Sequence, residues 1–514
     1  MGLLIRGIHY TRHFSSVSQN QNELSHLTKL INISKARAEY LAIRHPVIKK
    51  MDKTKLKELI DTLHDLGYPK ETLVKEPLLF SLLPITLRYR YRILNECGIT
   101  NITASHVAAY LNLVKQKTIG ELKKSGEIQS MMNVENRLAS YMTQWPTSLT
   151  TLINDDVNNY TLQMLRLRII QRYLELVLDL TNEEFNRGIL TYPTIKHRPL
   201  EVLNETLTML QSQIMLPTHK IKSNLYLVQA DPDNLRQIIY NFRSIGGIDI
   251  KEVIRLHPKV ATKNFSSLMA IREVLQEYGI SNEAQKKCFE IYTLGPNTIR
   301  ERLENAKTIP EFNAFFNHPR FLKMIYFNKT AMKRLMTLYN NNKKCLSLNI
   351  LSGSSSRYEA FEKAPGDRLG KGKDLIFCLT QALGRNYTSS EVRQIIRRHP
   401  FWINIPLVQV KFVHQQLSKE YTPKDIFENC PILLYPWNKV NEALSIMNKR
   451  QKHVQNKSLE HLNLSCLNNS QKLSLALYFL ESNHYFSGNG VWTEEKNKPA
   501  PNSLQLESRT VAQQ

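Results

Sequence analysis

The chain has 514 residues, with 69 Lys and Arg against 45 Asp and Glu, so its formal net charge at pH 7 is +24. A hydrophobic content of 42% is enough to bury a sizeable core, which excludes general disorder. Such an excess of positive charge favours an acidic macromolecular partner, usually nucleic acid or an anionic membrane surface, over a small acidic substrate. No apolar run reaches the ~18 to 20 residues that cross a bilayer, so we expect no membrane insertion.

Residues 1–22 have the composition of a mitochondrial transit peptide. They contain no Asp or Glu, and they carry Arg6 and Arg12 among apolar residues and several serines. The segment Arg12-His13-Phe14-Ser15 resembles the sites at which such presequences are cut. The sequence therefore predicts import into the mitochondrial matrix.

Four segments that begin at a proline share one template. They begin at Pro46, Pro77, Pro258 and Pro400. Ten residues on stand Leu56, Leu87, Leu268 and Val410, and seventeen on stand Leu63, Leu94, Leu275 and Leu417. This spacing predicts an amphipathic helix after each proline. In the first three segments a glycine (Gly67, Gly98 or Gly279) predicts the end of that helix, because glycine readily adopts the left-handed conformation.

The stretch before each proline is also helical in pattern, and proline disfavours helix in the residue that precedes it. Weaker copies of the template are predicted around Pro146, Pro193, Pro296 and Pro319, and the repeats look poorly formed between about 100 and 230. A helical unit of ~30 to 40 residues cannot bury its apolar face alone, so neighbouring units stack. The predicted fold is an all-α helical-repeat superhelix, an α-solenoid, whose hand the sequence leaves open.

The predicted repeats occupy residues 35–340 and 374–450. Between them, residues 341–373 hold the runs Ser352–Ser356 and Gly366–Lys373, which predict a flexible insertion. The second run superficially resembles a phosphate-binding loop, but it has three residues between its glycines where that loop has four. Residues 451–514 are predicted to be a polar tail with a short helix, whose apolar signal between Gln471 and Glu481 either caps the last repeat or docks a partner.

The repeat resembles that of the mitochondrial transcription termination factor (mTERF) family. The unit is an apolar residue, three further residues, proline and an apolar pair, as in Leu73–Leu79 and Ile396–Trp402. The resemblance covers roughly residues 35 to 450 and is strongest at 40–100, 235–280 and 390–450. It implies a superhelix that binds double-stranded mitochondrial DNA or ribosomal RNA in the matrix and modulates transcription or ribosome assembly.

Most of the charge belongs to the repeats, since residues 23–450 carry a net +21. Arginines recur there at i, i+4, a spacing that places both on one face of a helix, and guanidinium groups bind phosphate oxygens well. The predicted nucleic-acid-binding residues are Arg88, Arg90, Arg92, Arg168, Arg172, Arg255, Arg393, Arg397 and Arg398. For any one of them, a solvated helix face is the competing interpretation.

Other residue patterns give no sign of catalysis. The six cysteines are dispersed without metal-ligand spacing, and the histidines before proline (His45, His257, His318 and His399) fit the last turn of a helix, where the helix dipole favours them. We therefore expect no metal, no cofactor and no enzymatic activity. The sequence predicts a DNA-binding regulator of mitochondrial transcription, in termination or initiation, located in the matrix nucleoid. The alternatives are a ribosomal RNA-binding assembly factor and a protein-interaction scaffold, with other transcription factors as possible partners.

Overall fold

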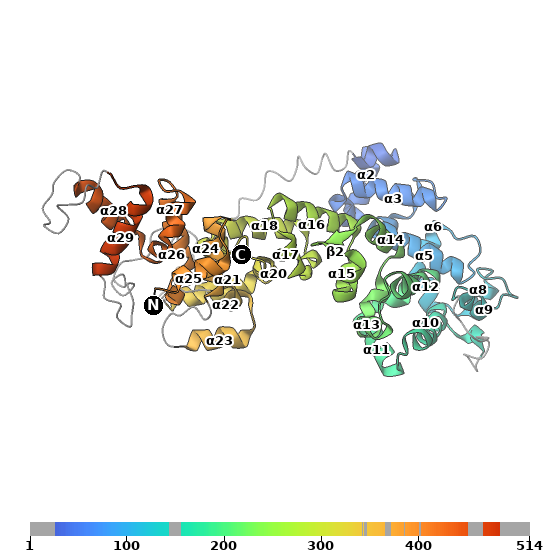
Figure 1. The fold of residues 1–514 in the computed structure, drawn as a ribbon. Coiled ribbons are helices and arrows are strands. Elements are labelled where there is room, and N and C mark those ends of the chain that lie inside the picture. The colour runs from blue at the N-terminus through green and yellow to red at the C-terminus, as the bar shows by residue number, and fades with distance from the viewer. Residues whose placement is uncertain are drawn as a thin grey trace, which may run out of the picture. The chain divides into compact units, whose positions relative to one another are not determined.

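The computed structural model describes residues 26–142, 156–341, 343, 347–364, 372–384, 386–399, 402–450 and 466–483. The predicted transit peptide, Pro146 and the segment Gly366–Gly370 lie outside these residues. The described chain is built almost wholly of helices, which confirms the all-α helical-repeat fold (Figure 1). It forms two compact units: the first holds the described residues up to Asn241 together with Ile254–Thr262, and the second holds Phe242–Val253 and the described residues from Lys263 onward.

The α-helices of the first unit are between four and seventeen residues long. Its α-helices are α2 (Lys35–Arg44), α3 (Lys53–Asp65), α4 (Thr72–Lys75), α5 (Pro84–Glu96), α6 (Ala104–Ala108), α7 (Tyr110–Gln116), α8 (Ile119–Lys124), α9 (Val134–Ala139), α10 (Leu162–Leu178), α11 (Asn182–Thr191), α12 (Leu200–Thr208), α13 (Thr218–Ser223) and α14 (Pro232–Asn241). Its 3₁₀-helices are η1 (Pro46–Lys50), η2 (Pro77–Ser81), η3 (Val157–Asn159), η4 (Pro193–His197), η6 (Leu225–Gln229) and η7 (Pro258–Thr262), and η5 (Met209–Gln213) is a π-helix. Helix α15 (Ile250–Leu256) has residues in both units.

The second unit begins with a small antiparallel hairpin of β1 (Ser244–Ile245) and β2 (Ile248–Asp249). Its helices are α16 (Phe265–Glu277), α17 (Asn282–Lys286), η8 (Phe289–Thr293), α18 (Pro296–Thr308), α19 (Pro310–Ala314), α20 (Phe321–Tyr326), α21 (Asn328–Asn340), α22 (Leu348–Ser352), α23 (Ser355–Lys363), α24 (Lys373–Leu383), α25 (Ser389–Ile396), η9 (Trp402–Asn404), α26 (Leu407–Leu417), α27 (Pro423–Glu428), η10 (Cys430–Leu434), α28 (Trp437–Arg450) and α29 (Asn469–Asn483).

The four template segments fold as their spacing predicts. The helices predicted after the four prolines are α3, α5, α16 and α26. The apolar residues ten and seventeen positions after each proline are all buried. Gly67, Gly98 and Gly279 have φ values of 80°, 81° and 65°, so each adopts the left-handed conformation directly after its helix. The predicted helix stop signals are therefore confirmed.

A 3₁₀ turn links the short helix to the long one, and its five residues have fixed roles. The N–H of the third residue donates to the carbonyl of the residue before the turn, as Ile48 does to His45. That third residue is at most 4% exposed in every case: Ile48, Leu79, Ile195, Leu227, Val260, Ile291 and Ile432. The repeat is thus anchored by one buried aliphatic side chain in each turn.

The positions of these turns correct the repeat prediction, which was based on the prolines. The turn at Pro193 is confirmed, but Pro296 begins the long helix α18 instead of a turn. In η10, Pro431 occupies the second position of the turn. Two turns, at Leu225 and Phe289, begin without proline and were not predicted. Part of the segment between 100 and 230 is therefore regular, because an apolar residue at the first position gives the same turn as proline does.

The predicted insertion is more ordered than its composition indicates, and the tail forms its predicted helix. Within 341–373, which the sequence predicts to be a flexible insertion, helices α22 and α23 form, and Lys343 Nζ donates to the carbonyls of Phe361, Glu362 and Ala364 at 2.7–2.8 Å. In the tail, α29 packs against α27, α28 and η10. The tail helix therefore caps the last repeat, which is one of the two roles predicted for it.

None of the helices in the described ranges combines the length and the apolar character that a membrane span needs.

Candidate nucleic-acid interface

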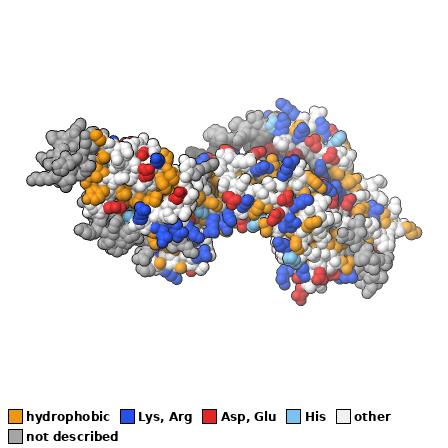
Figure 2. Space-filling view, viewed as in Figure 1, with side chains coloured by type: hydrophobic (Ala, Val, Ile, Leu, Met, Phe, Trp, Pro, Cys, Tyr) orange, Lys and Arg blue, Asp and Glu red, His pale blue; other side chains and the backbone are white. Residues whose placement is uncertain are grey.

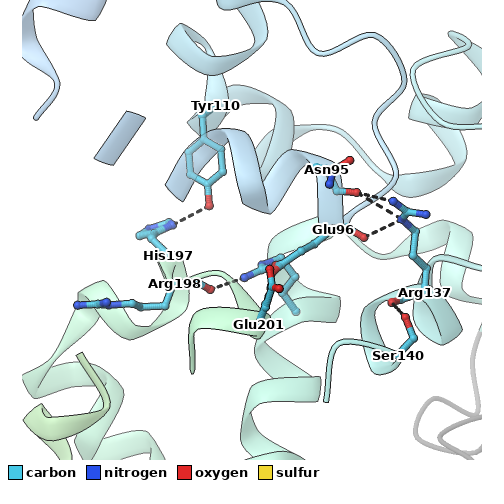
Figure 3. A network of polar contacts seen from close by, with 9 residues as sticks. Asn95, Glu96, Tyr110, Arg137, Ser140, His197, Arg198 and Glu201 are labelled. Carbon is cyan, nitrogen blue, oxygen red and sulfur yellow. Dashed lines mark hydrogen bonds and ion pairs between the residues drawn. The ribbon is translucent and has the colours of Figure 1, made fainter. Parts of the chain in front are cut away.

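A buried ion pair lies at the centre of the first unit (Figure 3). Arg166 of α10 donates from Nη1 to Glu96 Oε2 of α5 at 2.7 Å, and its side chain is only 1% exposed. Its Nη2 donates to the carbonyl of Arg198 at 2.5 Å, and Glu96 Oε1 accepts from the N–H of Glu201 at 3.1 Å. The pair therefore joins α5, α10 and the start of α12, and it has no access to a ligand.

Two neighbouring groups repeat this use of arginine inside the first unit. Arg198 donates to Tyr89 Oη at 2.8 Å and to the carbonyl of Ala230 at 3.2 Å, while Tyr89 donates to Asp231 at 2.7 Å. Arg90 lies over the ring of Tyr110 and donates to the carbonyls at the end of α6. Tyr89 is thus held by hydrogen bonds to Arg198 and Asp231 within the first unit.

Cations at the carboxyl ends of helices are a recurrent feature of both units. Unpaired carbonyls and the helix dipole make such an end negative, so a buried Lys or Arg satisfies it. Arg137 donates to Asn95 and Glu96 at the end of α5, Arg302 to Ile325 and Tyr326 at the end of α20, and Arg334 to Ile350, Leu351 and Gly353 at the end of α22. Part of the basic excess therefore holds the repeats together.

The arginines predicted from sequence divide into several kinds. Arg90 is a correction, because its guanidinium is committed to the end of α6. Arg255 is half-buried on α15. Among the exposed arginines, Arg88 pairs with Asp65 at 3.0 Å and Arg172 with Glu175 at 3.5 Å. The remaining side chains are exposed and make no hydrogen bond or ion pair with the described residues: Arg92, Arg168, Arg393, Arg397 and Arg398. They lie on α5, on α10 and at or just after α25.

A basic surface that the sequence analysis did not identify lies in the second unit. Helices α20, α21 and α22 pack together, and Lys329 and Lys333 are exposed one turn apart on α21. Arg320 is exposed before α20 and donates to Asn349 at 2.8 Å, and Lys323 is half-buried on α20. Figure 2 shows Lys and Arg gathered in the region of α21 and α22. We call Arg320, Lys323, Lys329 and Lys333 the α20–α21 basic surface.

The sequence holds a signal for this surface that arginine spacing does not reveal. From Phe312 to Tyr358 there is no Asp or Glu, while the same 47 residues contain eight Lys and Arg. Two acidic groups that contact this region are buried: Glu311 pairs with Tyr339, and Asp374 accepts from the N–H of Leu348. Positive charge is therefore left without acidic neighbours along this part of the chain.

The described residues contain no cluster of three or more His, Cys, Asp or Glu that is suited to hold a metal ion. Burial raises the pKa of the Cys97 thiol to about 11 and that of Cys430 to about 12, so both thiols are protonated and inaccessible near neutral pH. Cations on exposed helix faces are the feature with binding potential.

We expect the second unit to lose stability in acid through His399. Burial lowers the pKa of His399 to about 4, and its ring packs edge-on against Tyr435. The unfolded chain binds this proton near pH 6.5, so the stabilisation present above pH 6.5 is lost as the pH falls towards 4, by about 2 kcal/mol after allowance for screening. Thermal unfolding followed from pH 7 to 4.5 tests this, because His399→Gln should flatten the dependence. His64→Gln, at an exposed position, should leave it unchanged, and equal slopes for His399→Gln and the wild type would contradict the assignment.

Comparisons with known proteins agree with the repeats. No family model matches the chain, and no solved structure matches it. Among curated proteins, Transcription termination factor 5, mitochondrial, from Drosophila melanogaster is 30% identical over 476 residues, which are 92% of this chain and 83% of the fly protein. Factor 5 is also the member of the family that the chain was expected to resemble. With this identity along nearly its whole length, the chain belongs to the mitochondrial transcription termination factor family.

Proposed function

We propose that this protein binds double-stranded mitochondrial DNA without catalysis and regulates transcription, in termination or initiation, in the matrix nucleoid. Its relative is named as a mitochondrial transcription termination factor, which supports both the compartment and the process. The α20–α21 basic surface carries the proposal, since it joins four cations in a stretch without acidic residues.

The proposed contacts are made to the phosphate backbone. Lysine and arginine that neutralise phosphates release the counterions condensed on the duplex, which gives affinity that is independent of base sequence. Arg320 immediately precedes α20 and Lys329 stands in the first turn of α21, and both side chains are exposed and available for such a contact. The exposed arginines of α10 and α25 are additional candidates for the same kind of contact.

Binding to duplex DNA should therefore weaken steeply with salt. Fluorescence anisotropy with a labelled duplex, measured from 50 to 300 mM salt, gives the slope of log Kobs against log salt. Each lost phosphate contact should reduce that slope by about 0.9. We expect Arg320→Gln/Lys329→Gln to lower it by about 2, and Arg168→Ala/Arg172→Ala tests the arginines predicted from sequence in the same way. Lys251→Gln/Lys259→Gln, which lies outside the α20–α21 basic surface and outside α10, serves as the control.

Two outcomes would overturn this function. Salt-independent association with a protein partner, with no measurable binding to duplex DNA, would favour the interaction scaffold. Crosslinking in organelles followed by sequencing of the bound nucleic acid distinguishes the other case, because recovery of ribosomal RNA in place of mitochondrial DNA would favour a ribosome assembly factor.

A further inference from the structure

The first two of these 3₁₀ turns expose aliphatic side chains at a position where the later turns carry none of Val, Leu or Ile. The second residue of the 3₁₀ turn is Val47 in η1 and Leu78 in η2, 47% and 55% exposed, and these two turns contact each other. In the later turns the same position carries Thr194, Tyr226, Lys259, Glu290 and Pro431. Exposed aliphatic side chains in two turns that contact each other form a local apolar patch, which is a candidate contact surface.

In the last repeat, an apolar residue at an otherwise polar position of the turn is covered by another helix. The fifth residue of each turn is polar in six of the seven turns, namely Lys50, Ser81, His197, Gln229, Thr262 and Thr293. In η10 it is Leu434, which is fully buried, and helix α29 packs against that turn. The apolar side chain of Leu434 is therefore covered by α29, whereas those of Val47 and Leu78 remain exposed.

The exposed face continues along α2. Tyr40 and Ile43 stand at i and i+3 on α2, a spacing that places both on one side of the helix, and they are 43% and 73% exposed. Val47 follows in η1, directly after the end of α2. We call Tyr40, Ile43, Val47 and Leu78 the α2–η2 apolar strip. The opposite face of α2 is buried through Ala38, Leu41 and Ala42.

Cations surround the strip. Residues 35–50 contain Lys35, Arg37, Arg44, Lys49 and Lys50 against the single acidic residue Glu39, and all six side chains are exposed. The guanidinium groups of Arg37 and Arg44 lie 5.2 and 5.0 Å from the centre of the Tyr40 ring. Figure 2 shows Lys and Arg gathered over α2 at the top of the view.

We propose that the α2–η2 apolar strip docks on an anionic lipid bilayer as a peripheral contact, a property separate from the nucleic-acid binding proposed above. Aliphatic and tyrosine side chains interleaved with Lys and Arg on one face of a surface segment match the interface of a bilayer, where the chains enter the acyl boundary and the cations meet lipid phosphates. A duplex backbone offers phosphates but no place for Ile43, Val47 and Leu78. The cations and the exposed apolar side chains together therefore favour an anionic bilayer, which has an acidic surface and a hydrophobic interior, as the partner.

Flotation of the full-length protein with vesicles tests the proposal. Vesicles of phosphatidylcholine with 30% phosphatidylglycerol should carry the protein, and vesicles of phosphatidylcholine alone should not. Ile43→Ser/Leu78→Ser should lower the partition coefficient by about tenfold or more, because two exposed aliphatic anchors are lost. Lys49→Gln and Lys50→Gln should each lower it by about fivefold, the effect of one basic residue near an anionic surface.

The controls separate this surface from general electrostatic adhesion. Leu190→Ser removes an aliphatic side chain that is 84% exposed on α11, and it should not change flotation. Lys329→Gln/Lys333→Gln should weaken duplex binding while flotation persists. Equal flotation of Ile43→Ser/Leu78→Ser and wild type would overturn the proposal, as would failure of the wild type to float. A change of oligomeric state in Ile43→Ser/Leu78→Ser, measured by analytical ultracentrifugation, would also overturn it, in favour of an interface with a second copy.

Discussion

Replacing Arg166 with Met is expected to lower the free energy of unfolding of the first unit by about 3–5 kcal/mol. The variant leaves the Glu96 carboxylate buried without its charge partner, and it removes the donor to the carbonyl of Arg198. Burial alone would lower the pKa of Arg166, yet its interactions with Glu96 and with the neighbouring Cys97 and Tyr110 together outweigh that effect and raise it. The folded unit therefore depends on a charged guanidinium in its interior. Urea denaturation followed by circular dichroism measures the loss, and hydrogen exchange locates it in α5, α10 and α12.

Matched variants distinguish the ion pair from a general cost of substitution. Glu96→Leu/Arg166→Met removes both charges, so it should recover most of the stability that Arg166→Met loses. Arg172→Met breaks an exposed pair on the same helix and should change the free energy of unfolding by less than about 0.5 kcal/mol. A loss below about 1 kcal/mol for Arg166→Met would show that the pair does not hold the three helices together.

The repeats could be predicted from sequence wherever proline marks the turn. Pro46, Pro77 and Pro258 begin 3₁₀ turns, and the apolar spacing after them gives the long helices correctly. The turns at Leu225 and Phe289 were missed because the fold requires a buried aliphatic residue at the third position, and proline at the first position only assists it. A search on Leu227, Ile291 and their equivalents would find repeats that a search on proline cannot.

The candidate site was harder to predict, because charge spacing carries no information on burial. Arg166 and Arg168 are two residues apart on α10, and the first is buried in an ion pair while the second is exposed. Arg90 stands between Arg88 and Arg92 in sequence but lies against α6. Which arginine turns inward depends on the carbonyl ends of helices that are distant in the chain, and these become visible only in the structure.

Lys333 and Arg334 are adjacent on α21, and we expect their replacement to have opposite effects on stability and on DNA binding. Arg334 donates to the carbonyls of Ile350, Leu351 and Gly353 at 3.1, 3.2 and 2.7 Å, so Arg334→Gln should lower the free energy of unfolding of the second unit by about 2–4 kcal/mol. Its folded fraction should keep the wild-type salt slope for duplex DNA.

Lys333→Gln should behave in the reverse way. Its side chain is exposed and makes no contact with the described residues that folding needs, so stability should change by less than about 0.5 kcal/mol. The slope of log Kobs against log salt should fall by about 0.9, the effect of one lost phosphate contact. Fluorescence anisotropy measured well below the melting temperature gives the salt slope of both variants, and urea denaturation gives their stability. An unchanged slope for Lys333→Gln would remove it from the α20–α21 basic surface, and a stable Arg334→Gln would mean that buried cations do not hold the helix ends.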